Sequence, residues 1–292
     1  MPLLLVLFNL ASVRSINGVR DVNFMPIPHR RSPVAFRNLK RKLLHFVFQP
    51  TCCFCGDEAP RGSEQEAIRN VAAESVEVEI CSRCYENVIN LAADRCYYCG
   101  NEAHPLNPFG SRCRICRHWN AKFDRAVAVG VYRGLLKDSI LEIKRDCNDV
   151  KAQQIGSLLG EVAEKFDLPA NIDCVVPVPS HWRRRMGRRG FHVADVMADG
   201  FCQVTGFRKN SQVLKCVRCT RKQAKLRPGQ RTKNVRGAFN VPKPDAIRDK
   251  RVVLLDDVMT SGATIIECSK VLMEAGANSV FVTVAARAAG MS

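Results

Sequence analysis

Two neighbouring carboxylates, Asp256 and Asp257, follow an apolar run and precede a stretch of small and hydroxyl-bearing residues, 258–264. Gly262 lets the backbone turn closely around an oxyanion, and the N–H groups of 260–264 are expected at a helix N-terminus, where the dipole favours phosphate. The acids repel phosphate and suit ribose-type hydroxyls or Mg²⁺ instead. A ligand with a phosphate, vicinal hydroxyls and a magnesium-binding diphosphate fits this set of residues. The alternative for the two acids alone is a strand that ends in an ordinary loop with a helix cap.

Eight of the fifteen cysteines form four C-x-x-C pairs. Each pair supplies two thiolates, half of a tetrahedral zinc shell, so the four pairs predict two closed, structural Zn²⁺ sites. Sequential pairing gives loops of ordinary zinc-ribbon size, and the spacing also permits a cross-braced arrangement. Cys53, beside a ligand, is a possible substitute for it. The predicted ligands are Cys52, Cys55, Cys81, Cys84, Cys96, Cys99, Cys113 and Cys116.

The basic residues of the chain are concentrated in one region. Of the formal net charge of +17, residues 181–244 carry +15, and 200–244 hold no acid. A basic stretch of this length indicates a polyanionic partner, either the phosphates of a small molecule or a nucleic acid. A solvated surface with a basic bias is the alternative.

The elements that must position these residues follow from the apolar pattern after Cys116. Apolar runs predict strands at 126–132, 173–179, 251–257 and 279–286, and helical periodicity predicts helices at 153–166, 192–206 and 263–276. Strands that alternate with helices indicate an α/β fold with a parallel sheet flanked by helices. Ligands bind at the carboxyl ends of such strands, so 177–180 and 256–264 are expected to open toward one crevice.

We expect three parts: an N-terminal segment at 1–49, a double zinc-ribbon-like module at 50–120 and an α/β domain at 121–292. The apolar run at the start of the chain is too short to span a bilayer and lacks a positive flank, although a signal peptide or a mis-chosen start remains open. The cysteine spacing favours a reducing compartment. These features predict a cytoplasmic protein without stable membrane insertion.

The segment "VVLLDDVMTSGAT" resembles the phosphoribosyl diphosphate (PRPP) binding motif of type I phosphoribosyltransferases. With the cysteine pairs, "VPVPSHWRRRMGRRGF" and "RKQAKLRPGQRTKNVRGAF", it resembles the ComF/GntX family of competence-associated phosphoribosyltransferase-like proteins. The resemblance implies a type I phosphoribosyltransferase fold and transfer of a phosphoribosyl group to a nitrogen acceptor, with Mg²⁺ bound alongside PRPP. His192 and Val193 depart from it, because the family commonly has Asn and Gln there.

The resemblance also assigns residues. It implies catalytic roles for Asp256, Asp257 and Lys144, and places the 5-phosphate on Val258, Met259, Thr260, Ser261, Gly262, Ala263 and Thr264. It implies a diphosphate loop of Pro179, Ser180, Arg183, Arg184 and Arg185. It further implies a mobile loop at 215–236 that contains Gln223, Arg231 and Asn234.

Two other functions agree with the same sequence. One is a non-catalytic accessory protein that binds single-stranded DNA during DNA uptake, since the basic stretch and the zinc module could hold a nucleic acid. The other is a PRPP-sensing regulator. The acceptor and the oligomeric state are not encoded in any motif of the chain.

Overall fold

A computed structural model describes residues 51–57, 80–89, 95–102, 112–166, 168–186, 190–221 and 226–288. The N-terminal segment 1–49, its apolar run and Gln223 lie outside the described residues. The residues from Gln49 onward form one compact unit. No helix in the described ranges is both long and apolar enough to cross a membrane.

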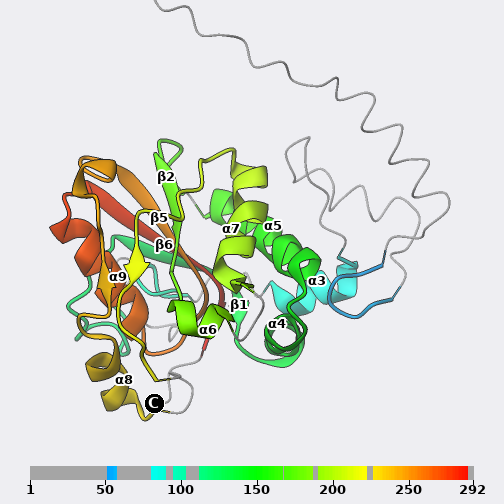
Figure 1. Ribbon diagram of the computed structural model, residues 1–292. Coiled ribbons are helices and arrows are strands. Elements are labelled where there is room, and N and C mark those ends of the chain that lie inside the picture. The colour runs from blue at the N-terminus through cyan, green and yellow to red at the C-terminus, as the bar shows by residue number, and fades with distance from the viewer. Residues whose placement is uncertain are drawn as a thin grey trace, which may run out of the picture. The chain divides into compact units, whose positions relative to one another are not determined.

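The centre of this unit is a parallel sheet with the order β1-β6-β5-β2 (Figure 1). Its strands are apolar nearly throughout, as expected of a sheet covered on both faces. The α/β fold is therefore confirmed. The strands span β1 Arg125–Val131, β2 Cys174–Pro177, β5 Arg251–Met259 and β6 Ser279–Arg287.

Helices cover both faces of the sheet. Val253 and Leu255 of β5 belong to the core under α4, α5 and α7, whereas Val252 and Leu254 belong to the core under α9. Successive strand residues point to opposite faces, so one apolar strand serves both cores. The main helices are α4 Gly134–Asp146, α5 Asp149–Lys165, α7 Val193–Thr205 and α9 Ala263–Glu274.

Helices α5 and α7 pack unusually closely because glycines face the contact. A Cβ at Gly200 would lie 1.9 Å from the carbonyl oxygen of Gln153, and one at Gly156 would lie 2.0 Å from that of Met197. Real Cβ atoms never approach a backbone atom so closely. The two glycines therefore set the distance between the helices.

The remaining elements are short. β3 and β4 form an antiparallel pair outside the main sheet, and α3 lies in the cysteine-rich part of the chain. The bounds are α3 Ser82–Val88, α6 Trp182–Met186, β3 Lys215–Cys216, α8 Pro228–Val235, β4 Phe239–Asn240 and the 3-10 turn Pro244–Ala246.

Candidate active site and metal centres

The two acids of β5 lie beside the lysine of α4. The Lys144 Nζ atom is 2.5 Å from Asp257 Oδ2, and neither side chain is more than 28% exposed. The N–H of Asp257 donates a hydrogen bond to Asp256 Oδ1 at 2.9 Å. The fold thus brings all three proposed catalytic residues together at the carboxyl end of β5.

The electrostatics of this group favour a bound cation or hydroxyls. Burial and the neighbouring Asp257 raise the pKa of Asp256 to about 8. Burial lowers the pKa of Lys144, but Asp257 and Asp256 outweigh that effect and raise it. A carboxylate whose charge is disfavoured by burial and a like charge gains most from an added cation or donor.

Tyr132 joins this group and was not anticipated from the sequence. Burial raises the pKa of Tyr132. The Lys144 ammonium opposes this effect by lowering the pKa, and the Asp257 carboxylate adds to it. Its backbone N–H donates to the carbonyl of Arg287 on β6. A polar aromatic residue directly after a buried strand was the signal that could have identified it.

The predicted phosphate loop connects β5 to α9. β5 continues through Met259, so Val258 and Met259 are paired strand residues and the strand is two residues longer than predicted. Gly262 caps α9 with a φ of 75°, a left-handed conformation that favours glycine. The three hydroxyl residues Thr260, Ser261 and Thr264 are half-buried, whereas Ala263 is buried.

The proposed diphosphate loop follows β2, directly beside β5. The N–H of Val178 donates to the carbonyl of Leu255 at 2.8 Å, so the pairing with β5 continues to the residue before Pro179 on one side and the residue before Asp256 on the other. The ends of β2 and β5 are therefore adjacent, and the crevice expected between them stays a prediction. The Arg183 guanidinium stacks on the Trp182 ring at 5.3 Å; the side chains of Arg184 and Arg185 are not among those described.

The proposed mobile loop makes internal contacts. The Asn234 side chain accepts from the N–H of Arg221 and donates to its carbonyl, at 2.9 and 3.0 Å. Arg231 Nε donates to the carbonyl of Leu226. In the described part of the loop these two residues stabilise the segment itself, and their contact with a ligand stays a prediction.

An open cavity of about 470 Å³ lies elsewhere, between α5 and α7. Its lining includes the carboxylates of Asp149 and Asp199. These charges repel an anionic ligand, so this cavity does not compete with the strand ends as a phosphate site.

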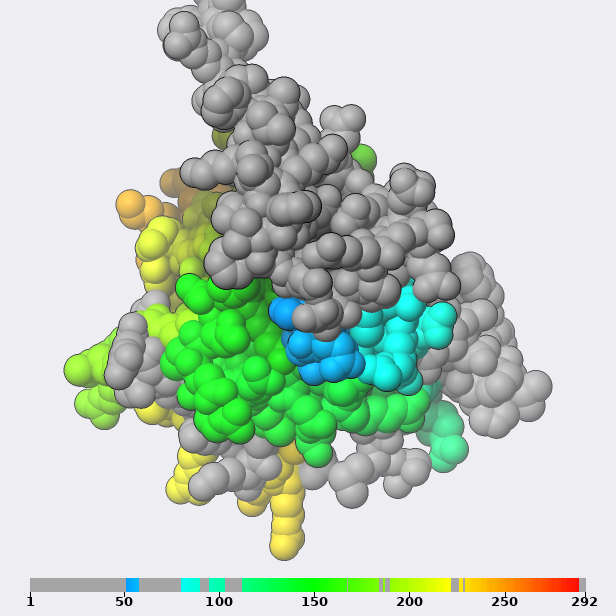
Figure 2. All heavy atoms as spheres, turned by 90° about the vertical axis from the view of Figure 1, so that its right-hand side faces the viewer, coloured from blue at the N-terminus to red at the C-terminus, as the bar shows by residue number. Residues whose placement is uncertain are grey.

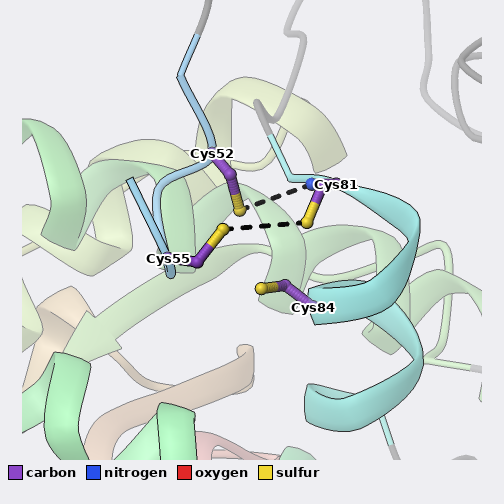
Figure 3. A group of neighbouring side chains, drawn as sticks. All are labelled: Cys52, Cys55, Cys81 and Cys84. Carbon is purple, nitrogen blue, oxygen red and sulfur yellow. Dashed lines mark hydrogen bonds between the residues drawn. The ribbon is translucent and has the colours of Figure 1, made fainter. Parts of the chain in front are cut away.

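The four C-x-x-C pairs form two clusters by sequential pairing. The first cluster contains Cys52, Cys55, Cys81 and Cys84, whose side chains point toward one another in Figure 3. The second cluster contains Cys96, Cys99, Cys113 and Cys116. Cys53, Cys216 and Cys219 belong to neither cluster.

The donor sets fit zinc. Within each cluster the sulfur atoms lie within 4.8 Å of one another. The Cys96–Cys116 and Cys99–Cys113 sulfur distances are both 3.6 Å, and the Cys55–Cys81 distance is 3.9 Å. A tetrahedral site with Zn–S bonds of about 2.3 Å requires about 3.8 Å between sulfurs.

Backbone hydrogen bonds favour the thiolate of one cysteine in the first cluster, Cys52, whereas burial raises the pKa of the Cys55 thiol. The N–H of Cys81 donates to Cys52 Sγ at 3.4 Å. Burial raises the pKa of the Cys52 thiol, but backbone hydrogen bonds outweigh burial and lower it to about 7. Zinc would be held by thiolates and would complete the folding of each knuckle, and a closed four-sulfur shell leaves no position for substrate.

Comparison with known proteins agrees with this geometry. The phosphoribosyl transferase domain family matches residues 149–291. The DNA utilization protein YhgH of Salmonella typhimurium is 30% identical over 210 residues, covering 70% of this chain and 88% of the relative. Competence protein F of Haemophilus influenzae is 26% identical (72% and 90% covered), and competence protein ComFC of Streptococcus pneumoniae is 24% identical (69% and 84%).

The chain belongs to the ComF/YhgH family. Its phosphoribosyltransferase-like fold is a parallel sheet flanked by helices, and two four-cysteine clusters lie toward its N-terminus. The domain match begins at Asp149, so Lys144 and both clusters precede the matched region. In this ComF/YhgH protein the proposed site therefore includes a residue from outside the matched domain.

Proposed function

We propose that this ComF/YhgH protein binds PRPP with Mg²⁺ and transfers its phosphoribosyl group to a nitrogen acceptor, releasing diphosphate. The observation that carries the proposal is the Lys144–Asp257 pair at 2.5 Å beside Asp256, directly before the turn at Gly262. Acids for hydroxyls and magnesium thus adjoin a helix N-terminus suited to the 5-phosphate. Phosphoribosyl transfer needs this combination at one strand end.

The reaction exchanges one bond at ribose C1. The bond to the diphosphate oxygen breaks with its electron pair, the nitrogen lone pair forms the new bond, and the proton of the nitrogen passes to solvent. Asp256 and Asp257 would hold Mg²⁺, and the ion would supply positive charge that stabilises the departing diphosphate. Asp256 and Asp257 hold the ribose hydroxyls directly or through Mg²⁺, Lys144 and Arg183 stabilise negative charge, and no nucleophilic side chain takes part.

Calorimetric titration with Mg²⁺–PRPP is the deciding experiment, combined with an assay for diphosphate release when candidate bases are added. Asp256→Asn with Asp257→Asn is expected to weaken binding at least about tenfold, because two charged contacts are lost. Asp245→Asn, a single removal of an exposed charge, is the control and should bind as the parent does. Absence of PRPP binding by the folded parent would refute the proposal, and binding without any release would favour a PRPP sensor.

Single-stranded DNA binding is the second candidate. Arg208, Arg218 and Arg236 are exposed cations in the region that carries +15, and the relatives are named for DNA utilization and competence. Charge-driven binding falls steeply with salt, since each phosphate contact releases counterions. Anisotropy with a labelled oligonucleotide at 50 to 200 mM salt tests this: a steep loss that PRPP does not alter supports DNA binding, and a flat response rejects it.

A further inference from the structure

A buried arginine ends the last strand of the sheet. Arg287 on β6 is only 1% exposed and is among the largest fully buried side chains in the described part of the protein. A buried guanidinium is costly unless its donors are satisfied. Its Nη2 atom has no hydrogen-bond partner among the described residues, so the position of Arg287 next to the phosphate loop is explained by the partners of Nε and Nη1.

The Arg287 guanidinium binds carbonyl groups from separate segments. Nε donates to Cys99 of the second cluster at 3.1 Å, and Nη1 donates to Met259 at 2.8 Å and also to Thr260. Nη1 also donates to Ala288 at 2.7 Å. One side chain thus joins a cysteine knuckle to the first residues of the phosphate loop.

Trp119 makes a second connection between the same two parts. The backbone N–H of Trp119 donates to the carbonyl of Cys116, so Trp119 belongs to the last knuckle of the second cluster. Its ring packs against Gly262, where an added Cβ would lie 2.7 Å from the ring. The Arg287 guanidinium lies 5.7 Å from the centre of that ring. The ring and the guanidinium therefore support neighbouring points of one loop.

We propose that Arg287 and Trp119 are positioning residues through which metal binding at the second cluster holds the phosphate loop in its ligand-binding conformation. The inference rests on the proposed PRPP site and adds a control of that site by the second cluster. The loop segment is short and leads into a glycine with positive φ, so its conformation depends on what surrounds it. Coupling of this kind is reciprocal: if metal tightens ligand binding, ligand must tighten metal binding.

The first test measures PRPP affinity by calorimetry in matched variants. Arg287→Lys keeps the charge and loses the multiple donors, and Arg125→Lys is its control, because Arg125 stacks on Tyr97 near the same cluster. We expect affinity to fall about tenfold in Arg287→Lys and in Cys113→Ser, against less than about threefold in Arg125→Lys and in Cys55→Ser of the first cluster. Equal losses in both clusters, or no loss in Arg287→Lys, would overturn the proposal.

The second test measures the reciprocal effect, which a purely structural role would not produce. Release of zinc to a chelator is followed with and without Mg²⁺–PRPP. PRPP is expected to slow release from the second cluster in the parent and in Arg125→Lys, and to have little effect in Arg287→Lys. A ligand effect on the first cluster alone would contradict the coupling.

A third measurement separates this inference from the proposed function. Hydrogen exchange of the peptide that spans 256–266 is compared between the parent, Cys113→Ser and Cys55→Ser without any ligand. Faster exchange in Cys113→Ser alone supports the coupling even if the parent binds no PRPP, in which case only the proposed function fails. Unchanged exchange in Cys113→Ser rejects the coupling. Trp119 fluorescence in a Trp182→Phe chain, which has no other tryptophan, reports whether each variant remains folded around the loop.

Discussion

The two cysteine clusters have the same donor set and the same spacing within each pair, yet they lie on different cores. Buried residues of the first cluster share a core with α4, α5 and α7, and the second cluster shares one with α9 and the opposite face of the sheet. In Figure 2 the blue segment 51–57 and the cyan segment 80–89 lie together over the green part of the chain. Two clusters with the same four-cysteine donor set thus pack against the cores on opposite faces of the sheet.

The clusters also differ in exposure and in what they touch. All four cysteines of the second cluster are buried, whereas Cys55 of the first is only partly buried. The second cluster reaches the phosphate loop through the carbonyl of Cys99 and through Trp119, and Gly100 packs against β1. The first cluster instead packs near α4, which carries Lys144. The two clusters therefore contact different residues of the proposed site, the second the loop before α9 and the first the helix that carries Lys144.

Metal removal should produce the largest effect and should separate the clusters. We expect two zinc ions per chain and release in two phases, the faster from the more exposed first cluster. Because metal binding supplies folding free energy, loss of both ions should abolish most of the folded population of this part of the chain. Metal analysis gives the number of zinc ions per chain, zinc release to a coloured chelator gives the two phases, and circular dichroism gives the folded population.

Single substitutions assign the phases of zinc release. Cys55→Ser should remove the fast phase, and Cys113→Ser should remove the slow phase. If Cys113→Ser instead removes the fast phase, the fast phase belongs to the second cluster. That result would contradict the expectation that the more buried cluster releases its zinc more slowly.

Gly200→Ala should disturb the core that contains the first cluster, α5 and α7, and should leave the core under α9 on the opposite face of the sheet largely unaffected. Its new Cβ meets a backbone oxygen at 1.9 Å, so α5 and α7 must separate, at a cost of about 3 kcal/mol in the free energy of unfolding. Gly206→Ala is the control, because it meets nothing within 4 Å and costs about 1 kcal/mol through its positive φ alone. Urea unfolding gives both values, and a Gly200→Ala cost no larger than the control would show that the helices are not in close contact.

The sequence was sufficient for the four main strands, for three of the helices and for the local motifs, but it did not predict α4, the helix that carries Lys144. Apolar runs placed the four main strands within two residues, since buried parallel strands are continuously apolar. The pairing of cysteines into sequential clusters, left open by spacing, is now defined by sulfur positions. The strands could be predicted because their signal lies in neighbouring residues, whereas the choice of cysteine pairing required the folded positions of the sulfur atoms.

The contacts that the sequence did not predict join distant residues. Arg287 and Cys99 are 188 residues apart, and Lys144 reaches Asp257 only after α4 packs beside the sheet. No periodicity encodes which carbonyls a buried arginine will bind, because the strand order decides it. A charged residue at the end of the apolar run 279–286 was the only local sign of Arg287.

The pH dependence of stability should be the smallest effect, and it belongs to the core of the first cluster. Glu161 on α5 is 5% exposed, and burial and Glu164 raise its pKa to about 7 although Lys165 opposes them. Because the unfolded carboxyl ionises near pH 4.3, its stability contribution is full below that pH and is lost as pH rises through 7. In urea unfolding, the advantage of Glu161→Gln over the parent should therefore grow by about 1 kcal/mol between pH 6 and pH 8. The exposed Glu274→Gln on α9 should show almost no such change. A constant Glu161→Gln difference across this range would mean that Glu161 remains ionised in the folded core.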